Sequence, residues 1–257
     1  MIMNYNLVKK ISTYILSFVL TFTVPTILHA DDILKGPIPK KSKFQLDTRF
    51  TYTRNEKGIT TLTNNIIGKY WEGDRLGKWV FINVPYKSVI NDQESSNGFG
   101  DITVGVGPGG RINNLHILSY FALTFPTGDS NERPALGNGR YDKKIGVVHT
   151  FLTNDKGFEI DTTVEYNLTG VNNKDINPPN EFYFGFIFGG KINERIRFAT
   201  GLTDLVKANG DFLLNSRSVL RYTFSPKIHL EALIDHGIQN HNVLKYDGLS
   251  LFLRYNL

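Results

Sequence analysis

The sequence predicts an all-β protein, a transmembrane antiparallel β-barrel of about twelve strands. Three observations predict it. Segments of about ten residues with alternating apolar and polar positions recur from residue 43 to residue 257, bounded by Gly, Asn, Asp or Pro. The connections between them alternate in length. After residue 30, no apolar run reaches the roughly 18 residues that a membrane helix needs, so any span there must consist of strands.

The alternation is clearest in the first and last segments. Phe44, Leu46 and Phe50 alternate with polar residues, and Leu249 and Leu251 begin the same pattern near the end. We expect strands near residues 43–54, 59–71, 78–88, 99–109, 115–126, 141–152, 158–169, 181–191, 195–205, 212–224, 228–238 and 246–257. The third is the least regular, because Trp79 and Phe81 fall on its nominally polar face.

The connections follow a second pattern. Those after even-numbered strands are short, whereas Val89–Gly98, Thr127–Arg140 and Gly170–Asn180, after odd-numbered strands, are longer and polar. Two odd connections, near residues 55–58 and 209–210, are also short. Short periplasmic turns opposite longer external loops are typical of outer-membrane barrels, and an even strand number places both termini in the periplasm. A soluble periplasmic β protein is the alternative, but it gives no reason for the alternation.

The N-terminus predicts export. Lys9 and Lys10 precede an apolar run from Ile11 to Leu28, which ends in Leu28-His29-Ala30. This order is that of a secretory signal peptide. We therefore expect a signal peptide at 1–30, a periplasmic segment at 31–42 and the barrel at 43–257. An uncleaved anchor is the alternative, against which Pro25 argues.

Composition narrows the function. The mean hydropathy of −0.21 excludes a bundle of membrane helices but suits a barrel, which needs apolar residues at alternate positions only. The chain has no cysteine, which excludes disulfides, zinc–thiolate sites and thiol catalysis. The net charge of +5 comes without a dense basic run, so nucleic acid is not an expected partner. We expect no cofactor and no metal.

Charged residues on the polar strand faces predict a charged lumen. Counting back from the turn Ser225–Lys227, Arg221 falls opposite Glu231 and Arg217 opposite Asp235, and opposite charges on neighbouring strands attract. The same lining includes Arg197, Arg254, Asp47, Arg49, Glu159, Asp161 and Glu165. Either the pairs neutralise each other and fill a narrow interior, or they line a water-filled pore and set its solute preference.

The histidines decide whether the sequence predicts an enzyme. Outer-membrane phospholipases use a Ser–His–Asn arrangement, in which the histidine must reach a hydroxyl. The five histidines after the leader are His116, His149, His229, His236 and His241, and none has a serine two residues away on the same face with an orienting Asn. His229, Glu231 and Asp235 share a face that could hold a metal, but ion pairing with arginine explains these carboxylates more simply.

The last strand looks like an assembly signal. Apolar residues occupy every second position from Leu249 to Leu257, which resembles the terminal strand by which the barrel-assembly machinery recognises its substrates. Leu257 departs from this pattern, in which Phe is commonest at the end.

The middle of the chain resembles a known family. The glycine-spaced stretch from Gly98 to Gly107, the element Phe125-Pro126-Thr127-Gly128-Asp129 and the stretch from Leu136 to Asp142 resemble an outer-membrane family named for the meta-pathway of phenol degradation. The resemblance implies a barrel that passes small, often hydrophobic compounds.

The glycines leave space on one strand face, either for an approaching loop or plug or for curvature of the sheet. Pro126, Thr127, Gly128 and Asp129 are expected to shape the longest loop, with substrate gating as the alternative.

We therefore predict a channel or transporter for small, hydrophobic or aromatic molecules, with outer-membrane lipid and lipopolysaccharide as its surroundings. The alternatives are a barrel enzyme acting on lipid, of the phospholipase or lipid A deacylase type, and a surface barrel that transports nothing.

Overall fold

The computed structural model describes residues 43–257 except 74–75, 154–156 and 172–177. The predicted signal peptide and the segment 31–42 lie outside these residues. The strands are β1 (Lys43–Asn55), β2 (Thr60–Gly73), β3 (Leu76–Ile90), β4 (Ser95–Phe99), β5 (Ile102–Ile112), β6 (Leu115–Phe125), β7 (Asp142–Leu152), β8 (Phe158–Leu168), β9 (Glu181–Lys191), β10 (Ile196–Lys207), β11 (Phe212–Ser225), β12 (Ile228–His241) and β13 (Tyr246–Asn256). Among the described residues, no helix has the length and apolar character to cross a membrane.

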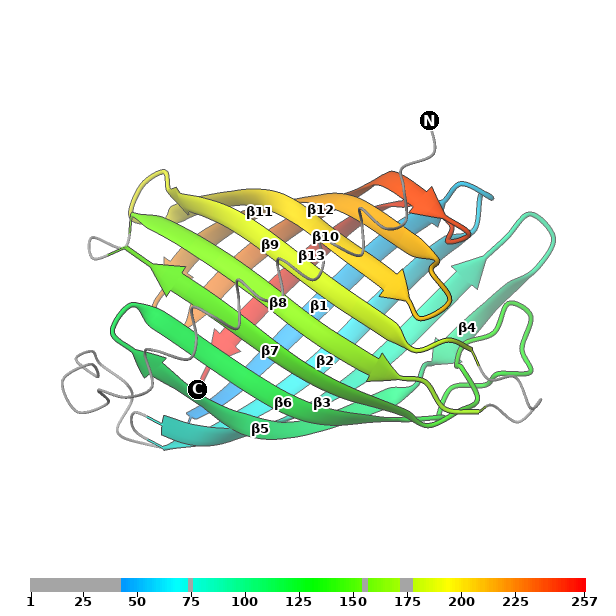
Figure 1. Ribbon diagram of the computed structural model, residues 1–257, viewed down its shortest axis with the longest axis horizontal. Helices are drawn as coiled ribbons and strands as arrows, with labels where there is room; N and C mark the ends of the chain where they lie inside the picture. The colour runs from blue at the N-terminus through cyan, green and yellow to red at the C-terminus, as the bar shows by residue number, and fades with distance from the viewer. Residues whose placement is uncertain (1–42, 74–75, 154–156, 172–177) are drawn as a thin grey trace.

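The strands form one sheet that closes on itself (Figure 1). Neighbouring strands pair antiparallel, and the circuit closes where β1 pairs with both β13 and β2. Of the thirteen strands, β4 pairs only with the end of β3, so the other twelve make the wall. The predicted twelve-stranded barrel is confirmed. Closure leaves no wall strand with an unpaired edge, as a membrane interior requires.

The connection predicted at Val89–Gly98 is largely strand, so that prediction was wrong. β3 continues to Ile90, and β4 returns beside it from Ser95 after a turn in which the Asn91 side chain accepts hydrogen bonds from the N–H groups of Gln93 and Glu94, at 2.9 and 2.6 Å. Polar residues occupy this hairpin because it lies at the end of the barrel, where alternation no longer reports on burial.

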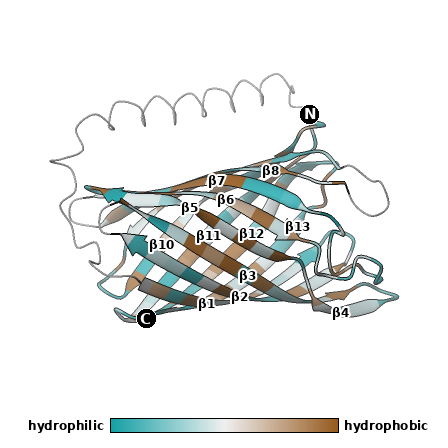
Figure 2. Ribbon diagram, turned by 90° about the horizontal axis from the view of Figure 1, so that it is seen from below, coloured by the Kyte–Doolittle hydropathy of each residue, from teal (hydrophilic) through white to brown (hydrophobic). Residues whose placement is uncertain are grey.

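The two faces of the wall differ in chemistry. Phe44, Leu46 and Phe50 are exposed on the outside of β1, whereas Asp47 between them is 1% exposed and points inward. The same parity continues around the wall, and hydrophobic segments run through its strands (Figure 2). A continuous exposed apolar belt is stable only in lipid.

The two ends of the barrel differ as well. The last strand ends beside the start of the first, where the Leu257 N–H donates to the Phe44 carbonyl at 2.9 Å. All connections at this end are short, whereas the opposite end carries β4 and the loop between β6 and β7 besides three short connections (Figure 1).

Candidate solute pathway in the barrel lumen

Two ion pairs join β11 to β12 in the register that the turn predicts. Arg217 lies opposite Asp235 and Arg221 opposite Glu231. Arg217 holds Asp235 through two hydrogen bonds, Nε to Oδ1 at 2.7 Å and Nη2 to Oδ2 at 3.0 Å. Arg221 Nε donates to Glu231 Oε2 at 2.5 Å. The first pair is therefore bidentate, the geometry in which arginine binds a carboxylate most strongly.

Asp47 is the centre of a second charged cluster. Its Oδ2 accepts from Lys69 Nζ at 2.8 Å and its Oδ1 from Arg254 Nε at 3.2 Å. Gln45 Nε2 donates to both oxygens, at 2.7 and 2.9 Å. One buried carboxylate thus serves two cations from neighbouring strands. Sequence reasoning missed Lys69, although alternation along its strand places it on the inner face.

The remaining predicted acids each have a partner. Arg197 Nη2 lies 2.7 Å from Glu159 Oε2, across β9, where Gly189 faces Glu159 and leaves room. Thr150 donates to Asp161 at 2.5 Å. Glu165 accepts from the Tyr120 hydroxyl and lies 3.1 Å from Lys144 Nζ. Tyr120 and Lys144 were also missed from sequence.

These inward side chains remain accessible to water. Lys69, Arg221 and Arg254 keep 30%, 31% and 33% of their side-chain surface exposed, although all three point into the barrel. A fully packed interior would leave such residues buried. The ion pairs therefore lie beside water-accessible space.

Aromatic side chains line the inside of β2, β3 and β6. Trp79 stacks on Phe81 with ring centroids 5.0 Å apart, and Tyr120 meets each of them edge-on at 5.8 Å. Trp79 Nε1 donates to the Ser119 carbonyl at 3.0 Å. Trp71 faces inward two residues beyond Lys69. This cluster explains why the third predicted strand looked irregular: its aromatic residues lie on the inner face.

Glycines make room for these rings. A side chain at Gly105 would collide with the Phe81 ring, and one at Gly146 with the Tyr120 ring. A methyl group at Gly109 would lie 2.8 Å from Trp71. The space predicted on the glycine-rich strand is therefore occupied by aromatic rings from neighbouring strands, which gives that spacing a packing reason.

The residues directly before β5, Gly100 and Asp101, do not face aromatic rings but hold the longest loop in place. The loop element Pro126, Thr127, Gly128 and Asp129 begins directly after β6. The Asp101 carboxylate accepts hydrogen bonds from the N–H groups of Gly128 at 3.0 Å and Asn138 at 2.6 Å. The Thr127 hydroxyl donates to the Gly100 carbonyl at 3.0 Å.

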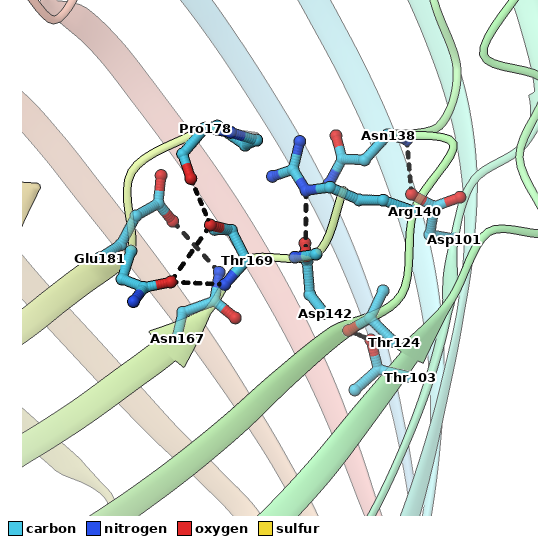
Figure 3. Close-up of polar contacts among 12 residues, drawn as sticks. Asp101, Thr103, Thr124, Asn138, Arg140, Asp142, Asn167, Thr169, Pro178 and Glu181 are labelled. Carbon is cyan, nitrogen blue, oxygen red and sulfur yellow. Dashed lines mark hydrogen bonds and ion pairs between the residues drawn. The ribbon is translucent and has the colours of Figure 1, made fainter. Parts of the chain in front are cut away.

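Further contacts tie this loop to its neighbours. The Asp129 carbonyl accepts from the N–H of Leu136 at 2.9 Å, and Leu136 is only 4% exposed, packed beside Gly98. Arg140 Nε donates to Asp142 at 2.8 Å (Figure 3). The same carboxylate accepts from the Gly170 N–H at 2.9 Å, which links the loop to the segment after β8.

The geometry defines a class, a closed antiparallel barrel of the outer-membrane type with a charged and aromatic lumen. The chain belongs to the family described as "Putative MetA-pathway of phenol degradation", which it matches over residues 68–254. No curated protein is detectably similar to it in sequence.

Solved barrels share the fold at low sequence identity. The COG4313 outer membrane channel from Pseudomonas putida F1 superposes with a TM-score of 0.69 at 14% identity, covering 88% of this chain and 98% of that one. The KdgM porin, solved with disordered oligogalacturonate, gives 0.53 at 9% identity, covering 82% and 98%. The β domain of the Bordetella autotransporter BrkA gives 0.52 at 9%, covering 84% and 99%.

Proposed function

We propose that this chain is an outer-membrane channel for small hydrophobic or aromatic molecules. The observation that carries the proposal is the lumen itself: water-accessible ion pairs on one part of the wall and aromatic rings on another. Such a lining offers a solute both a polar and an apolar surface. The family's description and the solved channels that share the fold support this function.

Conductance tests the proposal. Refolded mature protein in planar bilayers should give discrete current steps, and liposomes that contain it should swell in solutions of small aromatic solutes. A barrel that inserts but carries no current, and that leaves swelling rates at the level of empty liposomes, would support the non-transporting surface barrel instead.

Location and orientation need their own test. We expect the mature chain to begin near Asp31, to depend on the barrel-assembly machinery and to fractionate with outer membranes and lipopolysaccharide. Because the chain has no native thiol, cysteines at Ser130 and Lys227 can be labelled specifically. Ser130 should react with an impermeant reagent in intact cells and Lys227 should not. The reverse pattern would invert the orientation. Asn173, in the other long loop, lies outside the described residues.

A second candidate function rests on three outward-facing residues. Ser216, His236 and Asp247 are direct cross-strand partners on β11, β12 and β13, and His236 Nδ1 lies 2.6 Å from Asp247 Oδ1. In serine hydrolases, a carboxylate orients the histidine that activates the serine. A search along single strands missed this set because the serine lies across the sheet from the histidine. The set lies on the outer face of the wall, so a lipid ester would be its substrate.

Fatty-acid release from phospholipid vesicles tests this candidate. Activity that is lost in Ser216→Ala but kept in Ser218→Ala, an outward-facing control on the same strand, would support a lipid hydrolase. No release by the wild-type protein would remove it.

A further inference from the structure

Among the described residues, Arg49 forms no ion pair with a carboxylate, unlike five other inward-facing cations of the barrel wall. Lys69, Arg197, Arg217, Arg221 and Arg254 each form an ion pair with a carboxylate. In the described part of the chain, no carboxylate lies within ion-pair distance of Arg49, which points inward from β1. Its guanidinium is held instead by neutral groups.

Those neutral groups fix the position of Arg49. Its Nε donates to the Thr51 hydroxyl at 3.1 Å and its Nη2 to the Ser250 hydroxyl at 3.3 Å. The guanidinium carbon lies 4.5 Å from the centroid of the Phe252 ring, a cation–π contact. Of the five N–H groups of a guanidinium, these two bonds use two. The others remain to bind a solute in the lumen.

The acids nearest to Arg49 are already paired with other cations. Asp47, two residues earlier, serves Lys69 and Arg254. Both oxygens of Asp235 accept from Arg217. Asp47 with its two partners already carries one excess positive charge, and Arg49 adds a second on the same strand.

Aromatic groups surround the same position. Besides Phe252, the phenols of Tyr183 and Tyr246 are close enough to Arg49 for electrostatic interaction, as are Arg217 and its ion-pair partner Asp235. Arg217 Nη1 donates to the Tyr183 hydroxyl at 3.2 Å. A solute whose carboxylate binds Arg49 would therefore place its remaining atoms beside aromatic rings.

We propose that Arg49 is the anion-binding point of the channel and that its preferred solutes are small aromatic carboxylates rather than neutral hydrocarbons. This inference rests on the proposed channel function and names its substrate class. A guanidinium binds a carboxylate through charge-assisted hydrogen bonds, about twice as strong as neutral ones. A neutral aromatic compound would gain only the ring contacts.

Current block in planar bilayers tests this proposal, with sodium benzoate as the probe and benzyl alcohol as its neutral counterpart. Benzoate should block the wild-type current, and Arg49→Gln should raise the half-blocking concentration about tenfold, the loss expected for one charge-assisted contact. Arg49→Lys keeps the charge but not the planar fork, so it should be intermediate. Arg54→Gln is the matched control, because Arg54 is exposed on the outer face of the same strand.

Equal block by benzoate in the wild type and Arg49→Gln would overturn the proposal, as would equal block by benzoate and benzyl alcohol. If the wild-type protein carried no current, the channel function would fail separately. Calorimetric titration of benzoate into the refolded protein in detergent would then still test Arg49, with Arg54→Gln again as the control. Heat-dependent gel mobility of each variant shows whether the barrel has folded.

Discussion

The inner wall of this barrel has two different halves. From β8 through β13 to β1, inward positions carry acids and bases that pair across strands, as in Arg217–Asp235 and Arg221–Glu231. From β2 to β7, most inward positions carry aromatic rings opposite glycines, as in Phe81 and Gly105, and the inward cations Lys69 and Lys144 of this half reach acids of the other half. The hydrogen-bonded frame is the same in both. In one half, the inner face is stabilised by pairing of opposite charges. In the other half, it is stabilised by volume matching, in which each ring fills the space beside a glycine. A solute in the lumen therefore meets both charged and aromatic surfaces.

The largest effect should come from the charged half. Asp47→Ala leaves Lys69 and Arg254 facing each other without a carboxylate in a site where Asp47 is 1% exposed. Removing one member of a fully buried ionic cluster costs on the order of 3–5 kcal/mol, and because Lys69 and Arg254 are partly open to water, we expect a loss of about 2–4 kcal/mol. Urea unfolding in lipid vesicles measures the loss. Thr48→Ala, on the outer face of the same strand, is the control, and an equal loss in both variants would show that the cluster is not buried in the membrane-embedded protein.

In the aromatic half, the fit between glycines and rings predicts a smaller loss of folding stability than Asp47→Ala causes. Gly105→Val places a side chain where the Phe81 ring lies. Overpacking of this kind costs about 1–3 kcal/mol. Because the conflict is with one ring, Phe81→Ala should restore most of the stability in the double variant. A loss that is unchanged by Phe81→Ala would place the conflict elsewhere and break the proposed pairing of glycine with ring.

The two cross-strand pairs should differ from each other. Arg217 and Asp235 are 19% and 8% exposed and share two hydrogen bonds, whereas Arg221 and Glu231 are 31% and 16% exposed and share one. Double-mutant cycles with alanine should give a coupling of about 1.5–3 kcal/mol for the first pair and about 0–1 kcal/mol for the second.

Conductance of the same variants sharpens this prediction. A small coupling together with altered ion selectivity means that the pair lines an open pore. A large coupling with unchanged conductance means that its role is structural. If neither property changes in any variant, the side chains do not face each other in the lumen.

The smallest effect concerns fluorescence. The two tryptophans of the chain, Trp71 and Trp79, both face inward in the aromatic half. Brominated lipids should therefore quench them weakly, whereas an aqueous quencher that enters the lumen should quench them more strongly. Arg221→Ala, in the other half, should leave both results unchanged. Strong quenching by lipid would place the indoles on the outer face, where tryptophans of membrane barrels commonly lie.

Much of this architecture is readable from local pattern. Alternation along the sequence located all twelve wall strands, although the strand expected near 99–109 begins only at Ile102, after a break at Gly100 and Asp101. The position of the turn set the register that pairs Arg221 with Glu231. Both are properties of one strand or one hairpin, so neighbouring residues specify them. The hairpin ending in β4 was missed because its strands extend beyond the membrane-facing wall, where no alternation marks them.

Strand number, membrane face and the two pairs beside a short turn thus follow from the sequence, because side chains alternate with period two and a hairpin aligns its own strands. Closure of the barrel decided the rest. It brought Arg254 to Asp47, which Lys69 already holds from the neighbouring strand, and it left Arg49 with hydroxyls and a ring. The contacts between β1 and β13 join residues 201 and 207 positions apart in the chain. Only the packing of the closed sheet determines which side chains share one carboxylate and which form no ion pair.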